Sequence, residues 1–217
     1  TLWADDLYMG LSFMSRYGGR FADRAMLRDA VRQVGRFHHY LWNPATELLY
    51  HGYYGDLERT AGAHWGRCNG WATVQLMDVL PAGGRDLRRL QALLERQIAG
   101  VVKRQSASGL WRQLLDREDS YEESSCSAIF VYCLAHAVCE GWIDIRYASA
   151  ALKGWEGLCR EKITPEGDLR DICVGTGIGN DMPFYYNRPK VDGETHGTGL
   201  LLDAGLEILR LKEKLNL

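Results

Sequence analysis

Apolar residues recur at spacings of three and four along most of this chain, the period of a helix with one buried face. The first predicted helix spans 4–17, with apolar residues Leu7, Met9, Leu11, Met14 and Tyr17. A second is predicted from Asp23, as its cap, to about Trp42. Further helices are predicted over 69–80, 85–106, 122–140, 146–162 and 196–213, and strands are scarce. The pattern indicates an all-α protein.

A turn followed by a short extended run recurs between the predicted helices, over 43–52, 106–113 and 164–170. The period of about 60 residues holds two helices and a short hairpin, which indicates stacked helical hairpins. Open solenoids have shorter periods of about 34–47 residues, so a closed ring of helical pairs, an α/α toroid, is favoured. A ring of six pairs would need about 360 residues at this period. We therefore expect residues 1–217 to form a single domain that is part of such a ring.

Composition narrows the class of protein further. Hydrophobic residues make up 46% and charged residues 25%, as in globular proteins, and the net charge of −2 indicates neither nucleic acid nor an anionic membrane surface as a partner. No apolar run is long enough to predict a membrane span. The six cysteines form no CxxC pair and are expected to be reduced core residues, which favours a cytoplasmic location. The chain begins without Met, so a targeting signal would lie outside it.

Aromatic residues gather at predicted helix starts and loops. The segment from Trp65 to Trp71 also contains Arg67, Asn69 and two glycines, which makes a poor core segment but a good rim for a sugar, since aromatic faces stack on sugar rings. Arg67 could clamp a carboxylate or form a surface ion pair, and the local sequence leaves both open. His51 lies in an extended run, where a lone histidine is more often structural.

Asp5 and Asp6 lie at the start of the first predicted helix, beside Trp3. Either carboxylate could cap the helix, or one could serve as a general acid facing a substrate. The helix start lowers a carboxyl pKa, whereas apolar burial raises it, and the sequence does not decide between them.

Several chemistries find no support in the sequence. The GxGxG run over 175–179 is followed by Pro183 and Pro189 rather than by a predicted helix, so we expect a tight loop near a ligand and not a nucleotide-binding loop. No HExxH, GxSxG or metal-ligand spacing is present. A sugar epimerase with paired histidine bases could use only His38 and His39, and neighbours in a helix face different ways.

The ordered set of motifs resembles glycoside hydrolase family 105, the unsaturated rhamnogalacturonyl hydrolases, which is related to the unsaturated glucuronyl hydrolases of family 88. The motifs that carry the resemblance are WADDLYM, LYHGY, WGRCNGW, SGLW, SYEESS, GTGIGNDMPFYYNRP and HGTG. Each is weak alone, but together they run in the same order from the first residues to about residue 210. The resemblance implies an (α/α)6 barrel, of which this chain would be the C-terminal part, lacking the N-terminal third.

The resemblance also implies an activity: removal of the unsaturated uronic acid that a lyase leaves at the non-reducing end of a pectin fragment. One Asp would protonate the C4=C5 vinyl ether and activate water for attack at C5, with no metal or organic cofactor. Matched position by position, Asp5 would be that acid and base, ranked above Asp6. His51, Trp65, Arg67 and Trp71 would hold the unsaturated sugar.

Two departures from the family pattern affect this expectation. Tyr53 stands where the family commonly has Trp. The family also has substrate contacts in its N-terminal third, so the chain alone is expected to be nearly inactive unless a missing segment or second chain completes it. The alternative is a non-catalytic carbohydrate-binding or interaction fragment of the same fold.

Overall fold

Capping side chains decide where the long helices begin. In the computed structural model, which describes residues 1–217, the carboxylate of Asp23 accepts hydrogen bonds from the backbone of Ala25 and Met26, 3.0 Å each, and starts α2 (Arg24–Leu41). Glu123 caps α5 (Ser124–Cys139) and Glu194 caps α8 (Thr195–Leu215) in the same way. The Asp23 cap predicted from the sequence is confirmed.

The helices predicted over 69–80, 85–106 and 146–162 agree with the structure to within a few residues at each end. They are α3 (Gly66–Val79), α4 (Leu87–Val102) and α6 (Ala148–Glu161). The other helical elements are η1 (Leu7–Ser12), α1 (Phe13–Arg20), η2 (Leu80–Ala82), η3 (Gly84–Asp86), η4 (Ile145–Tyr147) and α7 (Met182–Tyr186). None of these helices combines the length and apolar character that a bilayer crossing requires.

Two elements differ from the sequence prediction. The first predicted helix is divided into the π-helix η1 and the α-helix α1, and η1 begins two residues after Asp5. The expected loop after the GxGxG run instead contains α7, with Pro183 in its first turn. Proline is tolerated there because the first N–H groups of a helix have no partner within it, so the expectation that Pro183 excludes a helix was wrong.

Short antiparallel strands connect the helices. The strands are β1 (Leu2–Trp3), β2 (Trp42–Asn43), β3 (Leu48–Leu49), β4 (Gly52–Tyr54), β5 (Arg59–Thr60), β6 (Ile172–Cys173) and β7 (Lys190–Val191). They form a three-stranded sheet in the order β1-β4-β5 and the two pairs β2-β3 and β6-β7. Pairing of β1 with β4 joins the N-terminal segment to a later hairpin of the chain. In this pairing Trp3 lies opposite Gly52.

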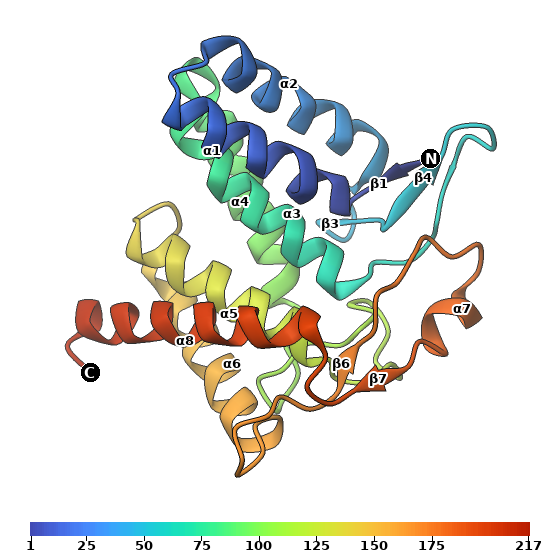
Figure 1. Ribbon diagram of the computed structural model, residues 1–217, viewed down its shortest axis with the longest axis vertical. Coiled ribbons are helices and arrows are strands. Elements are labelled where there is room, and N and C mark those ends of the chain that lie inside the picture. Colours follow the sequence, from blue (N-terminus) through green and yellow to red (C-terminus); the bar gives the residue numbers. More distant parts are fainter.

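The helices pack in two rows. The inner row runs η1/α1, α3, α5, α8, each in contact with the next, and α2, α4 and α6 pack behind it. Figure 1 shows α1 to α4 together in the upper half and α5, α6 and α8 in the lower half. Helices α3 and α5 are buried on nearly all sides, whereas α2, α4 and α6 keep an exposed face. These rows are the two layers of an α/α toroid.

The repeated turns predicted from the sequence occupy equivalent places in successive hairpins. Glu47 and Gly109, each just before the leucine of its turn, adopt left-handed backbone conformations with φ of 58° and 97°. The turn at Glu47 packs its carbonyl against Gly100 of α4, and the turn at Ser108 packs its carbonyl against Gly157 of α6. A side chain at either glycine would collide with that carbonyl, which explains why each outer helix carries a glycine there.

Both ends of the inner row carry exposed apolar stripes. On η1/α1 the stripe consists of Met9, Phe13, Tyr17 and Phe21, and on α8 it consists of Leu202, Leu206 and Leu209. The spacing of three or four places each set on one helix face. All of these side chains are exposed, so neither stripe is packed into the hydrophobic core.

Candidate active site

The inner helices begin at one end of the molecule, where their starts are linked by side-chain contacts. Asp5 precedes η1, Trp65 precedes α3, Glu123 precedes α5 and Glu194 precedes α8. Asp5 is hydrogen-bonded to His51, and the Trp65 ring packs against the His51 ring. Arg67 in the first turn of α3 and Glu123 are hydrogen-bonded to Cys173 of β6, and His196 in the first turn of α8 lies against Gly175 just after β6. Sugar recognition was predicted for residues at this rim.

Asp5 and His51 are brought together by the β1–β4 pairing. The Ala4 N–H donates to the His51 carbonyl (2.9 Å), and the His51 N–H donates to the Ala63 carbonyl (2.8 Å), so the backbone on both sides of the imidazole is fixed. Oδ2 of Asp5 then lies 3.0 Å from Nε2 of His51. The imidazole is fully buried, whereas the Asp5 side chain is 17% exposed and is the one a ligand can reach.

A third residue, Tyr185 of α7, completes this chain of hydrogen bonds. Its hydroxyl accepts from the Gly179 N–H (3.0 Å) and lies 2.9 Å from Nδ1 of His51. Burial raises the pKa of Tyr185 well above its usual range, so the phenol keeps its proton and can donate it to Nδ1. Nδ1 is then the acceptor, and Nε2 carries the proton that points at the Asp5 carboxylate.

Trp65 and Arg67 pack behind His51, with the two aromatic rings tilted by 42°. The Trp65 ring lies with its centroid 4.6 Å from the His51 ring, and the Arg67 guanidinium lies 4.5 Å from the Trp65 centroid. Both side chains are almost completely buried. Trp65 therefore covers one side of the His51 ring, while Nε2 of the ring is bonded to Asp5.

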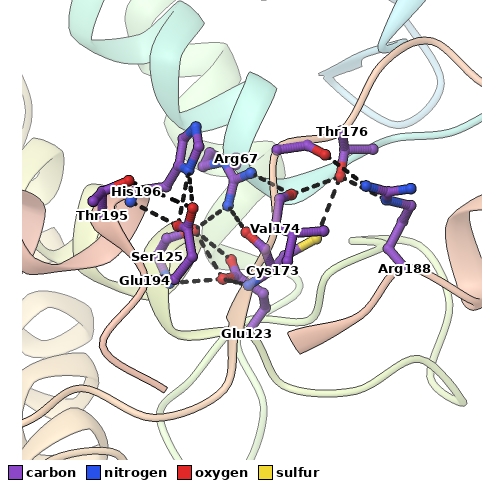
Figure 2. A network of polar contacts seen from close by, with 11 residues as sticks. Arg67, Glu123, Ser125, Cys173, Val174, Thr176, Arg188, Glu194, Thr195 and His196 are labelled. Atoms are coloured by element: carbon purple, nitrogen blue, oxygen red, sulfur yellow. Dashed lines mark hydrogen bonds and ion pairs between the residues drawn. The ribbon is translucent and has the colours of Figure 1, made fainter. Parts of the chain in front are cut away.

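The Arg67 guanidinium is bonded to the protein itself. Nη1 donates to Ser125 Oγ (2.9 Å) and to the Cys173 carbonyl (2.6 Å), and Nη2 donates to the Val174 carbonyl (2.9 Å). Figure 2 shows Arg67 at the centre of this network. Arg67 therefore holds the segment after β6 in place, and its predicted role as a carboxylate clamp stays a prediction.

Glu123 gives Arg67 a buried counter-charge through Ser125. The Ser125 hydroxyl contacts both Glu123 carboxylate oxygens (2.8 and 2.9 Å), and the same carboxylate accepts the N–H groups of Ser125, Cys126 and Cys173. A buried carboxylate with this many donors is well compensated. Because it also accepts from Cys173, it ties the start of α5 to β6.

Residues 174–180, here called the glycine segment, cross the rim from α8 to Tyr185. A methyl group at Gly175 would lie 3.6 Å from His196, one at Gly177 would lie 3.4 Å from Trp3, and one at Gly179 would collide with Phe184. The tight loop near a possible ligand was predicted from the sequence, and the structure places it against Trp3, two residues before Asp5.

Trp71 and Asp6 stand apart from the Asp5–His51–Tyr185 chain. Trp71 is half-buried one helical turn beyond Arg67 and stacks on Tyr8, with ring centroids 4.4 Å apart. Burial of its carboxyl raises the pKa of Asp6, with the backbone of Trp3 lowering it and the charge of Asp5 raising it. Asp6 makes no hydrogen bond to His51, which supports ranking it below Asp5.

A separate cavity lies away from these residues. It measures about 1070 Å³ and is formed by α2 and the connection from α3 to α4, with Arg28, Arg32, Arg85 and Arg89 among its lining residues. None of the predicted site residues lines it.

Sequence reasoning did not select Tyr185, Glu123 or Ser125 as site residues. Tyr185 and Glu123 lie inside motifs that support the family resemblance, but no local spacing links them to His51 or Arg67. Tyr185 and His51 are 134 residues apart in the sequence, and Ser125 and Arg67 are 58 residues apart. Only the fold could reveal these pairs.

Comparisons with known proteins give a consistent result. The sequence pattern of Glycosyl Hydrolase Family 88 matches residues 1–212. The unsaturated rhamnogalacturonyl hydrolase YesR of Bacillus subtilis is 28% identical over 217 residues, 98% of this chain and 61% of that protein. A 24.9 kDa protein of the picA locus of Rhizobium radiobacter is 31% identical over 94% of this chain and 99% of its own length.

A solved structure of a related glycoside hydrolase has the same fold. A family 105 glycoside hydrolase from C. acetobutylicum superposes with a TM-score of 0.88 at 28% identity, covering 96% of this chain and 65% of that one. This chain therefore spans less than two thirds of the length of that enzyme and of the rhamnogalacturonyl hydrolase.

Proposed function

Since the chain belongs to Glycosyl Hydrolase Family 88, we propose that it removes a 4,5-unsaturated uronic acid from the non-reducing end of lyase-generated rhamnogalacturonan or pectin oligosaccharides. The observation that carries this proposal is the Asp5–His51–Tyr185 hydrogen-bond chain, which ends on a single partly exposed carboxylate. The similarity to a protein named as an unsaturated rhamnogalacturonyl hydrolase supports the choice of substrate.

A single carboxylate suits hydration of a vinyl ether better than ordinary acetal hydrolysis, which uses two carboxylates flanking the bond. Asp5 delivers a proton to C4 of the sugar, and positive charge develops at C5 next to the ring oxygen. A water attacks C5 and returns its proton to Asp5, giving a hemiketal. The ring then opens to a C5 ketone, and the C1 hemiacetal expels the leaving sugar as an alcohol.

His51 acts in this proposal through Asp5. Its Nε2–H donates to Oδ2 and keeps the carboxylate in one orientation while the proton is delivered and recovered. The Trp65 ring prevents the imidazole from moving back, and Arg67 supports Trp65 from behind. Trp71, which is half-buried, is proposed as an aromatic surface for the sugar.

Turnover of an unsaturated rhamnogalacturonan disaccharide tests the function. Loss of the ultraviolet absorbance of the double bond, together with release of the free leaving sugar, is the result that this proposal predicts. It departs from the sequence-based expectation that the chain alone is nearly inactive, because Asp5, His51 and Tyr185 are all joined within this chain. Binding of the disaccharide without any loss of absorbance would favour the alternative, a carbohydrate-binding or interaction fragment of the same fold. Absence of both binding and turnover would refute the proposal.

A further inference from the structure

The cavity between α2 and the connection from α3 to α4 is rich in arginine and lies far from Asp5. Helix α3 begins at the rim and ends just before η2, and its 14 residues span about 20 Å between the rim and this cavity. Figure 1 shows α2 beginning at the end of the helices away from β1 and β4. The mechanism proposed for Asp5 uses none of the lining residues.

Two of the four arginines in the lining are already paired with carboxylates. Nε of Arg32 donates to Asp29 (3.0 Å), and Nε of Arg89 donates to Asp86 (3.3 Å). The hydrogen bond from Arg32 holds the pKa of Asp29 below its usual range, so this carboxylate is ionised near neutral pH. Asp29 and Asp86 are the only acidic residues of the lining. Their charges are therefore already matched by Arg32 and Arg89.

The other two arginines, Arg28 and Arg85, have no carboxylate partner. Neither side chain makes an ion pair or a hydrogen bond within the protein, and both are exposed. They come from two different elements, since Arg28 belongs to α2 and Arg85 to η3. The lining thus has an excess of two positive charges, although the whole chain has a net charge of −2.

Small residues leave room beside these side chains. A methyl group at Gly35 of α2 would lie 3.5 Å from Nη1 of Arg89, so the guanidinium of Arg89 crosses α2 where no side chain stands in its way. Ala25 and Ala82 also line the cavity. Its volume of about 1070 Å³ is larger than one small ion needs and is comparable to the sites of small organic molecules.

A diphosphate group matches the two unpaired arginines. A guanidinium binds a phosphate group through two parallel N–H donors, and all the outer oxygens of a phosphate accept hydrogen bonds. A single carboxylate carries one charge and would leave one arginine without a partner. A diphosphate offers one phosphate group to each of Arg28 and Arg85, and its charge offsets the positive excess of the lining.

We propose that this cavity binds a small molecule with a diphosphate group, held by Arg28 and Arg85. The rest of the cavity accommodates whatever the diphosphate is attached to. The proposal does not depend on the proposed function, because the cavity shares no residue with the Asp5–His51–Tyr185 chain.

Titration calorimetry of the 217-residue chain with inorganic pyrophosphate, at constant ionic strength, tests the proposal. We expect saturable binding with a Kd at least about tenfold lower than that of inorganic phosphate, because two arginines are engaged instead of one. Arg28→Gln combined with Arg85→Gln is expected to raise the Kd of pyrophosphate at least about tenfold.

Arg36→Gln combined with Arg88→Gln is the matched control. These two arginines are also exposed and lie on α2 and α4, but neither lines the cavity. The control removes the same charge and should change the Kd of pyrophosphate less than about twofold, since exposed charges at a distance are largely screened. Circular dichroism checks that both double variants remain folded.

A titration with ADP identifies the source of the diphosphate. Tighter binding of ADP than of pyrophosphate would assign the site to an organic diphosphate, and the reverse order would assign it to the inorganic ion. Equal weakening of pyrophosphate binding in the two double variants would overturn the proposal, because binding would then follow net charge alone. Absence of pyrophosphate binding, or tighter binding of tetragalacturonate, would also overturn it.

Discussion

Asp5 meets its partner His51 across 46 positions of sequence, and His51 meets Tyr185 across 134. The three side chains form one line of hydrogen bonds in which only the Asp5 end reaches the surface. At this scale the structure sharpens the sequence prediction: Asp5 differs from its neighbour Asp6 because it alone is bonded to the buried imidazole. His51, predicted to hold the sugar, is fully buried, so its proposed role is exerted through Asp5.

Asp5→Asn is expected to lower kcat at least about a hundredfold, because an amide cannot deliver and recover a proton. Binding of the disaccharide should change little, since the amide keeps the size of the carboxylate. Asp6→Asn is the matched control and should retain most of the activity. If Asp6→Asn were the inactive variant instead, the assignment of the acid to Asp5 would be wrong.

Tyr185→Phe removes the hydroxyl that bonds Nδ1 of His51 and the Gly179 N–H. We expect kcat to fall about tenfold with a smaller change in KM, and unfolding to become about 1–3 kcal/mol easier because buried groups lose their partner. Steady-state kinetics and urea unfolding measure the two effects. Tyr186→Phe is the control, since that hydroxyl bonds only exposed Asp119; equal losses in both variants would contradict the prediction.

At the scale of elements, capping and burial decide what each helix contributes. Inner helices α3 and α5 place Arg67 and Glu123 at their starts, and the buried hydroxyl of Ser125 joins the two charges. On the outer helix α2 the sequence prediction that His38 and His39 face different ways is confirmed, since His38 is buried and His39 is exposed. The two residues therefore do not form a pair of bases.

His38 is expected to make stability depend on pH. Burial lowers the pKa of His38 from 6.5 to about 4, with Arg89 lowering it further and its bonds to Val34 and Gln97 opposing the shift. Below pH 6.5 the unfolded chain binds a proton that the folded chain does not, so stability falls as the pH drops from about 6.5 to about 4. The loss is about 3 kcal/mol at full effect.

Urea unfolding at several pH values measures this dependence. His38→Gln should flatten the slope between pH 6.5 and 4, whereas His39→Gln on the exposed side of α2 should leave it as in the wild type. A slope that persists unchanged in His38→Gln would assign the acid sensitivity to other groups, such as His64, whose pKa is also lowered by burial.

At the scale of the whole molecule, the two rows of helices end in apolar faces. Met9, Phe13, Tyr17 and Phe21 lie at one end of the inner row and Leu202, Leu206 and Leu209 at the other. Exposed apolar stripes of this kind promote contacts between molecules. The chain covers 61% of the length of one relative and 65% of a solved family 105 structure.

We expect the isolated 217-residue chain to self-associate as its concentration rises, through these two faces. Sedimentation velocity over a concentration series should show the sedimentation coefficient increasing. Leu202→Gln combined with Leu206→Gln should reduce the increase, whereas Glu213→Gln on the same helix should not. A chain that stays monomeric at all concentrations would show that these faces are not adhesive.

The sequence by itself predicted the long helices, the repeated hairpin and the Asp23 cap, which the structure confirms, and it proposed Asp5 as the acid, which stays a prediction. These depend on spacing within a few residues or on motifs that are contiguous in the chain, and such information is local. Family membership followed from the order of the motifs and is confirmed by the match over residues 1–212. The sequence analysis missed the short helix α7 at Pro183 and the π-helix η1 after Asp5, because each is too short for a helical period to mark it.

Only the tertiary structure decided how the rim is built. Arg67 looked like a free clamp in the sequence, yet packing of α3 against α5 and β6 buries its charge beside Ser125 and two carbonyls. Tyr185 reached His51, and His196 came to lie against Gly175, because separate helix starts converge at one end of the toroid. No periodicity encodes such contacts, since they join residues whose separation in the chain bears no relation to their distance in the fold.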